Sequence, residues 1–251
     1  MKRKVAVITG ATGGIGFAVA KRLGQDGYTV ILNGIDDEAG AERVKELTSE
    51  GIEAEYYSFD VTNEEAVTKN IKAIGEKYGK IDTLVNNAGG LGGRSRFEEM
   101  TTEFYRSVMA LNLDSTFFAS RAAIPYLKKG EGASIINYTS NAAWTAGGPG
   151  AGIYGTSKAG VNTITKALAK DLAEYGIRVN AVSPGTIDTP FHAQIKATKP
   201  EVFASWANSI MLGRLGQPED VAGVVSFLAS SDAKFITAET IQIGGGQALG
   251  I

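Results

Sequence analysis

The 251-residue chain contains no cysteine and only one histidine, His192. It can form no disulfide, and a zinc site would have to be built mostly from carboxylates, so we expect no metal centre. The same scarcity argues against Ser-His-Asp and Cys-His nucleophilic schemes, which need an imidazole or a thiolate. The chemistry of this chain should therefore depend on other side chains.

An excess of one charge and long apolar runs are also missing. The 25 basic and 27 acidic residues give a net charge of -2, which indicates no nucleic-acid partner. The basic start, Met1–Lys4, is followed by the short apolar run Val5–Ile8 and then Gly10, which is too short for a signal peptide. No segment approaches the roughly 18 apolar residues of a membrane span. We expect a cytoplasmic protein without a membrane partner.

Short apolar runs alternate with helical patterns along the whole chain. Strands are expected at 5–9, 28–32, 54–59, 81–85, 134–138, 179–182 and 240–243. Helices are expected at 15–25, 38–50, 63–78, 102–127, 154–175 and 218–229. The alternation predicts an α/β fold, with one doubly wound parallel sheet of about seven strands and helices on both faces. Residues 1–251 would form a single domain, in which the less regular segment 190–212 is a lid over the ligand crevice.

A glycine-rich loop separates the first expected strand from the first expected helix. Within Thr9–Gly16, Gly10, Gly14 and Gly16 have a G-x-x-x-G-x-G spacing. Glycines let the backbone approach a pyrophosphate, and the helix N-terminus offers N–H groups to it. The loop is not a P-loop, because no Gly-Lys-Ser/Thr follows it. It predicts a Rossmann-like dinucleotide site, with a merely structural tight turn as the alternative.

The segment after the second expected strand bears on the choice of dinucleotide. An NADP site needs an arginine or lysine for the 2′-phosphate, and none occurs at 11–16 or 33–40. Asp36, Asp37 and Glu38 would repel that phosphate, so we expect NAD(H) to be favoured over NADP(H). Gly34 takes the place of the acidic residue that usually ends this strand. Asp36 or a backbone group would then meet the ribose hydroxyls.

Tyr154 and Lys158 are four residues apart in an expected helix, so their side chains share a face. A lysine cation beside a phenol favours the phenolate and lowers its pKa. Such a tyrosine can exchange a proton with a carbonyl or alcohol oxygen near neutral pH. The spacing also arises often by chance, and the alternative is a half-buried tyrosine on a surface helix.

These motifs occur in one order along the chain, and together they resemble the short-chain dehydrogenase/reductase family. The resemblance rests on the glycine loop, Asn86-Asn87-Ala88-Gly89, Ser140, Tyr154 to Lys158, and Pro184-Gly185. It covers essentially the whole chain, and the motifs are specific jointly although each is weak alone.

The resemblance implies an enzyme that transfers a hydride between a nicotinamide and a carbonyl or alcohol carbon. Tyr154 would be the general acid or base, and Lys158 would lower the tyrosine pKa and hold the nicotinamide ribose. Ser140 would hydrogen-bond the reacting oxygen, and Asn112 would support a proton-relay water through its helix. The alternatives are a strand-end turn hydroxyl for Ser140 and a helix polar contact for Asn112. The implied cofactor residues are Gly10, Thr12, Gly13, Ile15, Gly16, Gly34, Asp36, Asp60, Val61, Asn87, Ala88, Gly89, Tyr154, Lys158, Pro184, Gly185, Ile187 and Thr189.

Three further segments, 88–94, 147–152 and 184–193, bear on the substrate. Together they look like those of the bacterial 4-deoxy-L-erythro-5-hexoseulose uronate (DEH) reductases of alginate catabolism, which produce 2-keto-3-deoxy-gluconate. Arg94 could clamp a substrate carboxylate, or it could be a surface charge. His192 could contact substrate hydroxyls, or it could face solvent from the lid. The implied substrate residues are Arg94, Ser140, Gly150, Tyr154 and His192.

Other activities within the family stay open. The Asn33-Gly34 strand end also resembles 3-hydroxybutyrate-type dehydrogenases. A 3-oxoacyl-[acyl-carrier-protein] reductase would want a basic patch, for which Arg121, Lys128 and Lys129 are candidates. A non-catalytic dinucleotide-binding sensor or scaffold is the alternative of a different class. Family analogy implies a homotetramer, with helices 102–127 and 154–175 in one interface and 241–246 in the other.

Overall fold

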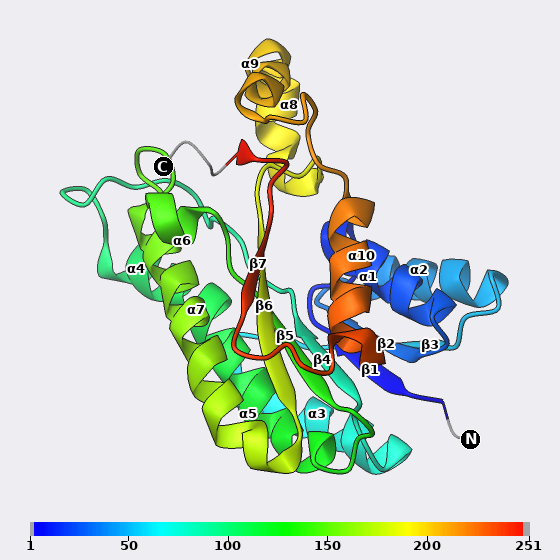
Figure 1. The fold of residues 1–251 in the computed structure, drawn as a ribbon. Coiled ribbons are helices and arrows are strands. Elements are labelled where there is room, and N and C mark those ends of the chain that lie inside the picture. The colour runs from blue at the N-terminus through cyan, green and yellow to red at the C-terminus, as the bar shows by residue number, and fades with distance from the viewer. Residues whose placement is uncertain (1–2, 248–251) are drawn as a thin grey trace.

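Seven parallel strands form one sheet in the computed structural model, which describes residues 3–247 and all their side chains except those of Phe191 and Gln194. The sheet order is β3-β2-β1-β4-β5-β6-β7 (Figure 1). This confirms the predicted fold class, although residues 1–2 and 248–251 of the expected domain lie outside the described part. The strands are β1 (Val5–Ile8), β2 (Thr29–Gly34), β3 (Ala54–Ser58), β4 (Thr83–Asn86), β5 (Ser134–Tyr138), β6 (Arg178–Pro184) and β7 (Thr240–Ile243).

Helices cover both faces of the sheet because successive strand residues point to opposite sides. Ala6 and Ile8 of β1 pack into one apolar cluster, and Val5 and Val7 pack into the other. The first face carries α1 (Gly14–Gln25), α2 (Asp37–Ser49) and α10 (Pro218–Ala229). The second carries α3 (Glu64–Tyr78), α5 (Ser115–Leu127) and α7 (Gly152–Leu172). Among the described residues, no helix has the length and apolarity that a membrane span needs.

The expected helix at 102–127 is not one regular α-helix. The chain forms α4 (Thr102–Met109), a π-helical turn (Ala110–Asp114) and then α5. Within the turn, the Asn112 amide nitrogen donates to the Val108 carbonyl at 2.9 Å. That carbonyl is the one an α-helical Asn112 backbone N–H would use, so the side chain occupies a backbone position. Such π turns recur at functional sites.

The strand order reverses at β1, whose neighbours are β2 and β4. In doubly wound sheets this reversal leaves a ligand crevice beyond the carboxyl ends of the strands. The lid segment stands over that edge and is more regular than expected, with two short helices, α8 (Ala193–Thr198) and α9 (Pro200–Ser205) (Figure 1). A short helix not expected from the sequence, α6 (Ala142–Thr145), follows β5 at the same edge.

Candidate active site

The glycine loop leaves β1 and turns at once into α1. Gly10 and Gly14 have φ angles of 62° and 52°, in the left-handed region that favours glycine. A Cβ on Gly16 would lie 2.3 Å from the Gly10 carbonyl oxygen and 2.5 Å from the Asn87 amide nitrogen. The loop therefore closes tightly against the start of α1, and the helix N-terminus is left at the crevice.

Two asparagines hold this loop in place. Asn87 donates to the carbonyl oxygens of Thr9 and Gly10, both at 2.9 Å. Asn33 accepts from the Gly10 N–H at 3.3 Å and donates to the Phe59 carbonyl at 2.8 Å. Asn33 thereby ties the loop to β2 and to the segment after β3. This role of Asn33 was not predicted, because the expected strand ended at residue 32, whereas β2 continues to Gly34.

The predicted ribose end of the site differs from expectation in two ways. Asp36 caps the N-terminus of α2 by accepting from the Ala39 N–H at 3.0 Å. Arg43, three residues beyond the segment searched for basic groups, reaches back to the loop, and its Nε donates to the Thr12 carbonyl at 3.3 Å. Its Nη1 pairs with Glu46 at 2.7 Å, which offsets its charge. Arg43 lies one to two turns into α2, and the helix carries its side chain back to Thr12 of the glycine loop.

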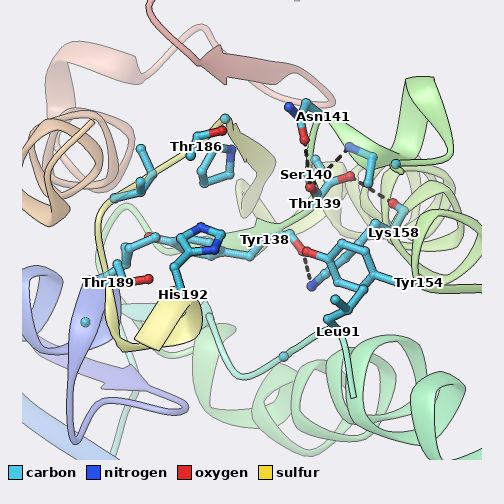
Figure 2. A pocket seen from close by; sticks show the side chains of 18 of the residues that line it. Leu91, Tyr138, Thr139, Ser140, Asn141, Tyr154, Lys158, Thr186, Thr189 and His192 are labelled. Atoms are coloured by element: carbon cyan, nitrogen blue, oxygen red, sulfur yellow. Dashed lines mark hydrogen bonds between the residues drawn. The ribbon is translucent and has the colours of Figure 1, made fainter. Parts of the chain in front are cut away.

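A cavity of about 490 Å³ opens beyond the carboxyl ends of the strands, and most of the predicted residues line it (Figure 2). Its wall has a glycine cradle at one end and polar side chains of β5 and α7 at the other, so the residues present fit a nicotinamide dinucleotide. The predicted residues that line it are Gly10, Gly13, Ile15, Gly16, Asn87, Gly89, Arg94, Ser140, Tyr154, Lys158, Pro184, Gly185, Ile187, Thr189 and His192.

The remaining predicted residues lie outside this wall. They are Thr12, Gly34, Asp36, Asp60, Val61, Ala88, Asn112 and Gly150. Asp60 accepts from the backbone and hydroxyl of Thr62, both at 2.8 Å, and so closes a turn. Gly150 accepts from the Ser95 N–H at 3.0 Å and so braces the Arg94 loop. A cofactor role for the six of these residues that were predicted to bind the dinucleotide stays a prediction.

Lys158 is 3% exposed, and its Nζ donates to the Tyr138 carbonyl at 2.9 Å. The Thr139 hydroxyl donates to the Lys158 backbone carbonyl at 2.9 Å, so the end of β5 holds this turn of α7 twice. Burial lowers the pKa of Lys158 from 10.5 to about 8, because the charged form loses hydration. Tyr138 and Thr139 were not among the predicted site residues.

The expected lowering of the Tyr154 pKa by Lys158 is wrong for the protein as it stands. Burial raises the pKa of the Tyr154 phenol, and the neighbouring Ser140 hydroxyl opposes this increase. The Lys158 Nζ lies 5.9 Å from the Tyr154 ring centroid and bonds to Tyr138 instead. The i to i+4 spacing put both groups on one face, but it also buried both, and burial disfavours each charged form.

Ser140 lies at the cavity wall with its hydroxyl held on two sides. Its Oγ accepts from the Ala142 N–H at 3.1 Å and donates to the Asn141 side-chain oxygen at 3.2 Å. Asn141 was missed by the sequence analysis, although it directly follows the predicted serine. These contacts orient the Ser140 oxygen beside Tyr154.

Asn112 lies behind the wall and bonds to a glycine segment. It accepts from the Gly90 N–H at 3.0 Å and donates to the Gly90 carbonyl at 2.8 Å. A Cβ on Gly89 would lie 2.8 Å from the Asn112 side-chain oxygen and 2.9 Å from the Lys158 Nζ. Gly89 thus lets the π turn and the buried lysine approach the same backbone. A proton-relay role for Asn112 stays a prediction.

Two of the three predicted substrate residues outside the catalytic group, Arg94 and His192, also reach the cavity. His192 packs edge-on against Trp206, with ring centroids 5.3 Å apart, and faces the cavity from the side opposite Tyr154 (Figure 2). Burial lowers the pKa of His192, which favours the neutral imidazole. The Arg94 guanidinium donates to the Pro149 carbonyl at 2.9 Å, which links two loops at the rim.

Comparison with known proteins places this site in a family. A family model described as enoyl-(acyl carrier protein) reductase matches residues 10–248. The chain is 38% identical to the 3-oxoacyl-[acyl-carrier-protein] reductase of Thermotoga maritima, over 98% of each chain. An aldohexose dehydrogenase structure from Thermoplasma acidophilum superposes with a TM-score of 0.88 at 35% identity, over 99% of this chain and 95% of the other. Actinorhodin polyketide ketoreductase with NADPH gives a TM-score of 0.91 at 33% identity, over 98% and 97%.

The protein belongs to the short-chain dehydrogenase/reductase family. It is an NAD(P)-dependent oxidoreductase that acts on CH–OH and C=O groups.

The glycine loop allows a matched test of the cradle. A Cβ on Gly13 meets nothing within 4 Å, and its φ of -171° is open to any residue, whereas Gly16 has no such room. We expect Gly13→Ala to keep dinucleotide affinity within about threefold and Gly16→Ala to weaken it at least about tenfold, since backbone must shift. Fluorescence titration with NADH measures both. Equal affinities for the two variants would contradict the described loop.

The burial of Lys158 predicts a pH-dependent stability cost. Its pKa of about 8 in the folded protein lies below its ordinary 10.5, so the charged form is penalised. The penalty is complete below pH 8 and vanishes as the pH rises to 10.5, where both states are neutral. Lys158→Met should therefore raise the free energy of unfolding at pH 7 by about 1–3 kcal/mol, with less gain at pH 10. Urea unfolding without added dinucleotide measures this, and no gain at pH 7 would refute it.

Proposed function

We propose that this protein is an NADH-dependent carbonyl reductase of a small sugar acid, with DEH reduced to 2-keto-3-deoxy-gluconate as the leading candidate reaction. One observation carries the proposal: Ser140, Tyr154 and Lys158 gather on one wall of the cavity that also contains the glycine loop. A non-catalytic sensor would have no need of this group.

The raised pKa of Tyr154 supports the reductive direction. Burial keeps the phenol protonated at neutral pH, so Tyr154 enters the reaction as a proton donor. Ser140 stabilises the charge that grows on the carbonyl oxygen. Lys158 holds the nicotinamide ribose from its fixed position on α7, and the Asn112 turn supports proton supply. A bound nicotinamide provides the hydride chemistry.

The charges around α2 support NAD(H). Asp36, Asp37 and Glu38 begin this helix beside the loop and would repel a 2′-phosphate. Arg43 is a basic group that contacts the loop, through the Thr12 carbonyl, and Glu46 already pairs with it. An NADPH preference in steady-state kinetics would show that Arg43 outweighs the three acidic residues.

The cavity rim supports a polar, acidic substrate. Arg94 and His192 line the cavity from two separate segments of the chain. Gly147 and Gly148 also line it, and because they have no side chains they leave room for a substrate. The structural relative named as an aldohexose dehydrogenase shows that sugar chemistry occurs on a closely similar fold. None of the three relatives named above is a uronate reductase, so DEH rests on the residues of the rim.

The Thermotoga maritima relative favours 3-oxoacyl-[acyl-carrier-protein] reduction as a second candidate. The basic groups suggested for carrier docking do not support it. The helix α5 ends at the amino edge of the sheet, opposite the crevice (Figure 1), and Lys128 and Lys129 directly follow it in the chain. The Lys128 Nζ lies 3.5 Å from the Tyr175 ring centroid. Arg121 pairs with Glu64. A 3-hydroxybutyrate-type activity remains a further alternative within the same chemistry.

We also propose the homotetramer that family analogy implies. Large apolar side chains are exposed on and beside α4, α5 and α7, including Tyr105, Phe117 and Trp144. They support an interface on this side, and light scattering would identify a monomer if the proposal were wrong.

Two cavity tyrosines form a matched pair for the catalytic assignment. The Tyr138 hydroxyl is buried without a hydrogen-bond partner, whereas Tyr154 lies beside Ser140. Tyr154→Phe should lower kcat/KM by about 10²–10⁴-fold through loss of the proton donor. Tyr138→Phe keeps the carbonyl that holds Lys158, and its activity should stay within about threefold. NADH oxidation against an aldehyde panel measures both, and full activity of Tyr154→Phe would remove the assignment.

The carboxylate clamp is tested at the rim. Arg94→Met should raise KM for uronate-derived aldehydes by about tenfold or more, and KM for neutral aldehydes by much less, since a charge-assisted hydrogen bond is lost. Arg96→Met, two residues away and outside the cavity wall, is the control. Equal increases for acidic and neutral aldehydes would exclude the clamp.

A further inference from the structure

A second cavity of about 220 Å³ lies directly beside the catalytic one. The two share Asn141 and Gly185, and Asn141 directly follows the predicted catalytic serine in the chain. The second cavity lies where β6 and β7 end, and its other lining residues are Ser183, Gln242, Gly244, Gly245, Gly246 and Gln247. Gly185 has an expected cofactor role, and Gln242 and Gly244 to Gly246 belong to the segment 241–246 expected in a subunit interface, but no ligand has been assigned to the cavity itself.

Ser183 is the unusual residue of this cavity. It is 2% exposed, it pairs with Gln242 across the sheet, and its hydroxyl oxygen has no hydrogen-bond partner. An unpaired buried hydroxyl is unfavourable, because water solvates it in the unfolded chain. Ser183 lines the cavity, so a rotation of its side chain would bring the hydroxyl to a polar group placed there and would satisfy it.

Asn141 connects this wall to the catalytic group. Its side-chain oxygen accepts from the Ser140 hydroxyl at 3.2 Å. Its amide nitrogen points away from Ser140, as Figure 2 shows. Asn141 lines both cavities. A ligand that accepts a hydrogen bond from the Asn141 amide nitrogen would therefore lie close to the Ser140 hydroxyl.

The opposite wall is built firmly. The Gln247 side-chain oxygen accepts from the Thr186 N–H at 3.0 Å, and its nitrogen donates to the Ser209 hydroxyl at 3.2 Å. A Cβ on Gly185 would lie 2.8 Å from the Gln247 oxygen and 2.9 Å from the Gly244 Cα. The glycines allow these segments to meet, and the cavity depends on that close approach.

The lining determines what the cavity can hold. None of the described residues that line it is charged, and its side chains offer hydroxyl and amide groups. Burying an ion here would leave it unpaired, which is costly. A neutral, hydroxylated group matches both the charge and the hydrogen-bonding capacity. The volume exceeds that of several waters, at roughly 30 Å³ each, and suits a short polyol segment.

We propose that the second cavity is a hydroxyl-binding subsite, in which Ser183 and Asn141 bind the hydroxylated part of the substrate next to the reacting carbonyl. The subsite selects hydroxyaldehydes over the corresponding simple aldehydes. This inference rests on the proposed carbonyl reductase activity and specifies its substrate class.

The kinetic test compares aldehydes of equal carbon number with and without hydroxyls: glyceraldehyde with propanal, and erythrose with butanal. The readout is the ratio of kcat/KM for the hydroxylated aldehyde to that for the simple one. Ser183→Ala should lower this ratio about tenfold through the lost hydrogen bond. Ser134→Ala is the matched control, since Ser134 is a buried strand serine that bonds to Thr83 away from both cavities. An unchanged ratio in Ser183→Ala overturns the proposal.

A binding test separates the subsite from the activity. Erythritol should raise the melting temperature of the wild type and of Ser134→Ala more than that of Ser183→Val, which fills the cavity with apolar groups. Equal increases in all three proteins would mean that erythritol acts only as a general osmolyte and that water alone serves Ser183, which overturns the subsite. A wild type that reduces no aldehyde overturns the proposed function instead, and the erythritol comparison then still decides the subsite.

Discussion

One hydrogen bond organises the site: the buried Lys158 ammonium donates to the Tyr138 carbonyl at the end of β5. It joins the long helix α7 to the sheet edge at which the parallel strands end. Tyr154 is one helical turn earlier on the same face, so the bond also determines where the phenol lies. Gly89 is required beside it, because a side chain there would displace the lysine or Asn112. The helix α7, the end of β5 and the π turn at Asn112 therefore all come together around the Lys158 ammonium.

Stability is given up for this arrangement. Lys158 is a charge taken out of water with one neutral partner, and the hydroxyls of Tyr138 and Ser183 are buried without any. Each costs folding free energy that an apolar core would not. All three groups line the cavities at the carboxyl edge of the sheet. The two apolar clusters that sandwich the sheet are mostly aliphatic, and Tyr138 itself packs into the first of them. The apolar packing on the two faces of the sheet stabilises the fold, whereas the costly polar groups lie at the cavities that carry the proposed chemistry.

Much of this could be predicted from local patterns, and the misses have physical causes. Alternating periodicity located the strands, and the glycine spacing located the dinucleotide loop. Asn33 and Arg43 were missed because their partners, the loop at Gly10 and Thr12, are over twenty residues away. The interruption of helix 102–127 was missed because Asn112, at the π turn, bonds to Gly90, which is 22 residues away in the chain. Spacing correctly paired Tyr154 with Lys158 but could not indicate that burial would dominate their pKa values.

The sequence by itself determined the layered α/β architecture and named the residues proposed for the dinucleotide loop and for proton transfer, because these depend on patterns within a few turns of chain. The tertiary structure alone decided how those residues are held, through contacts between segments that only folding brings together. It placed Asn141 between two cavities, left the Ser183 hydroxyl unpaired in one of them, and turned Lys158 toward Tyr138. Burial and hydrogen-bond partners depend on contacts between distant segments, which exist only in the folded chain. They determine how reactive these side chains are, and a local sequence pattern cannot predict them.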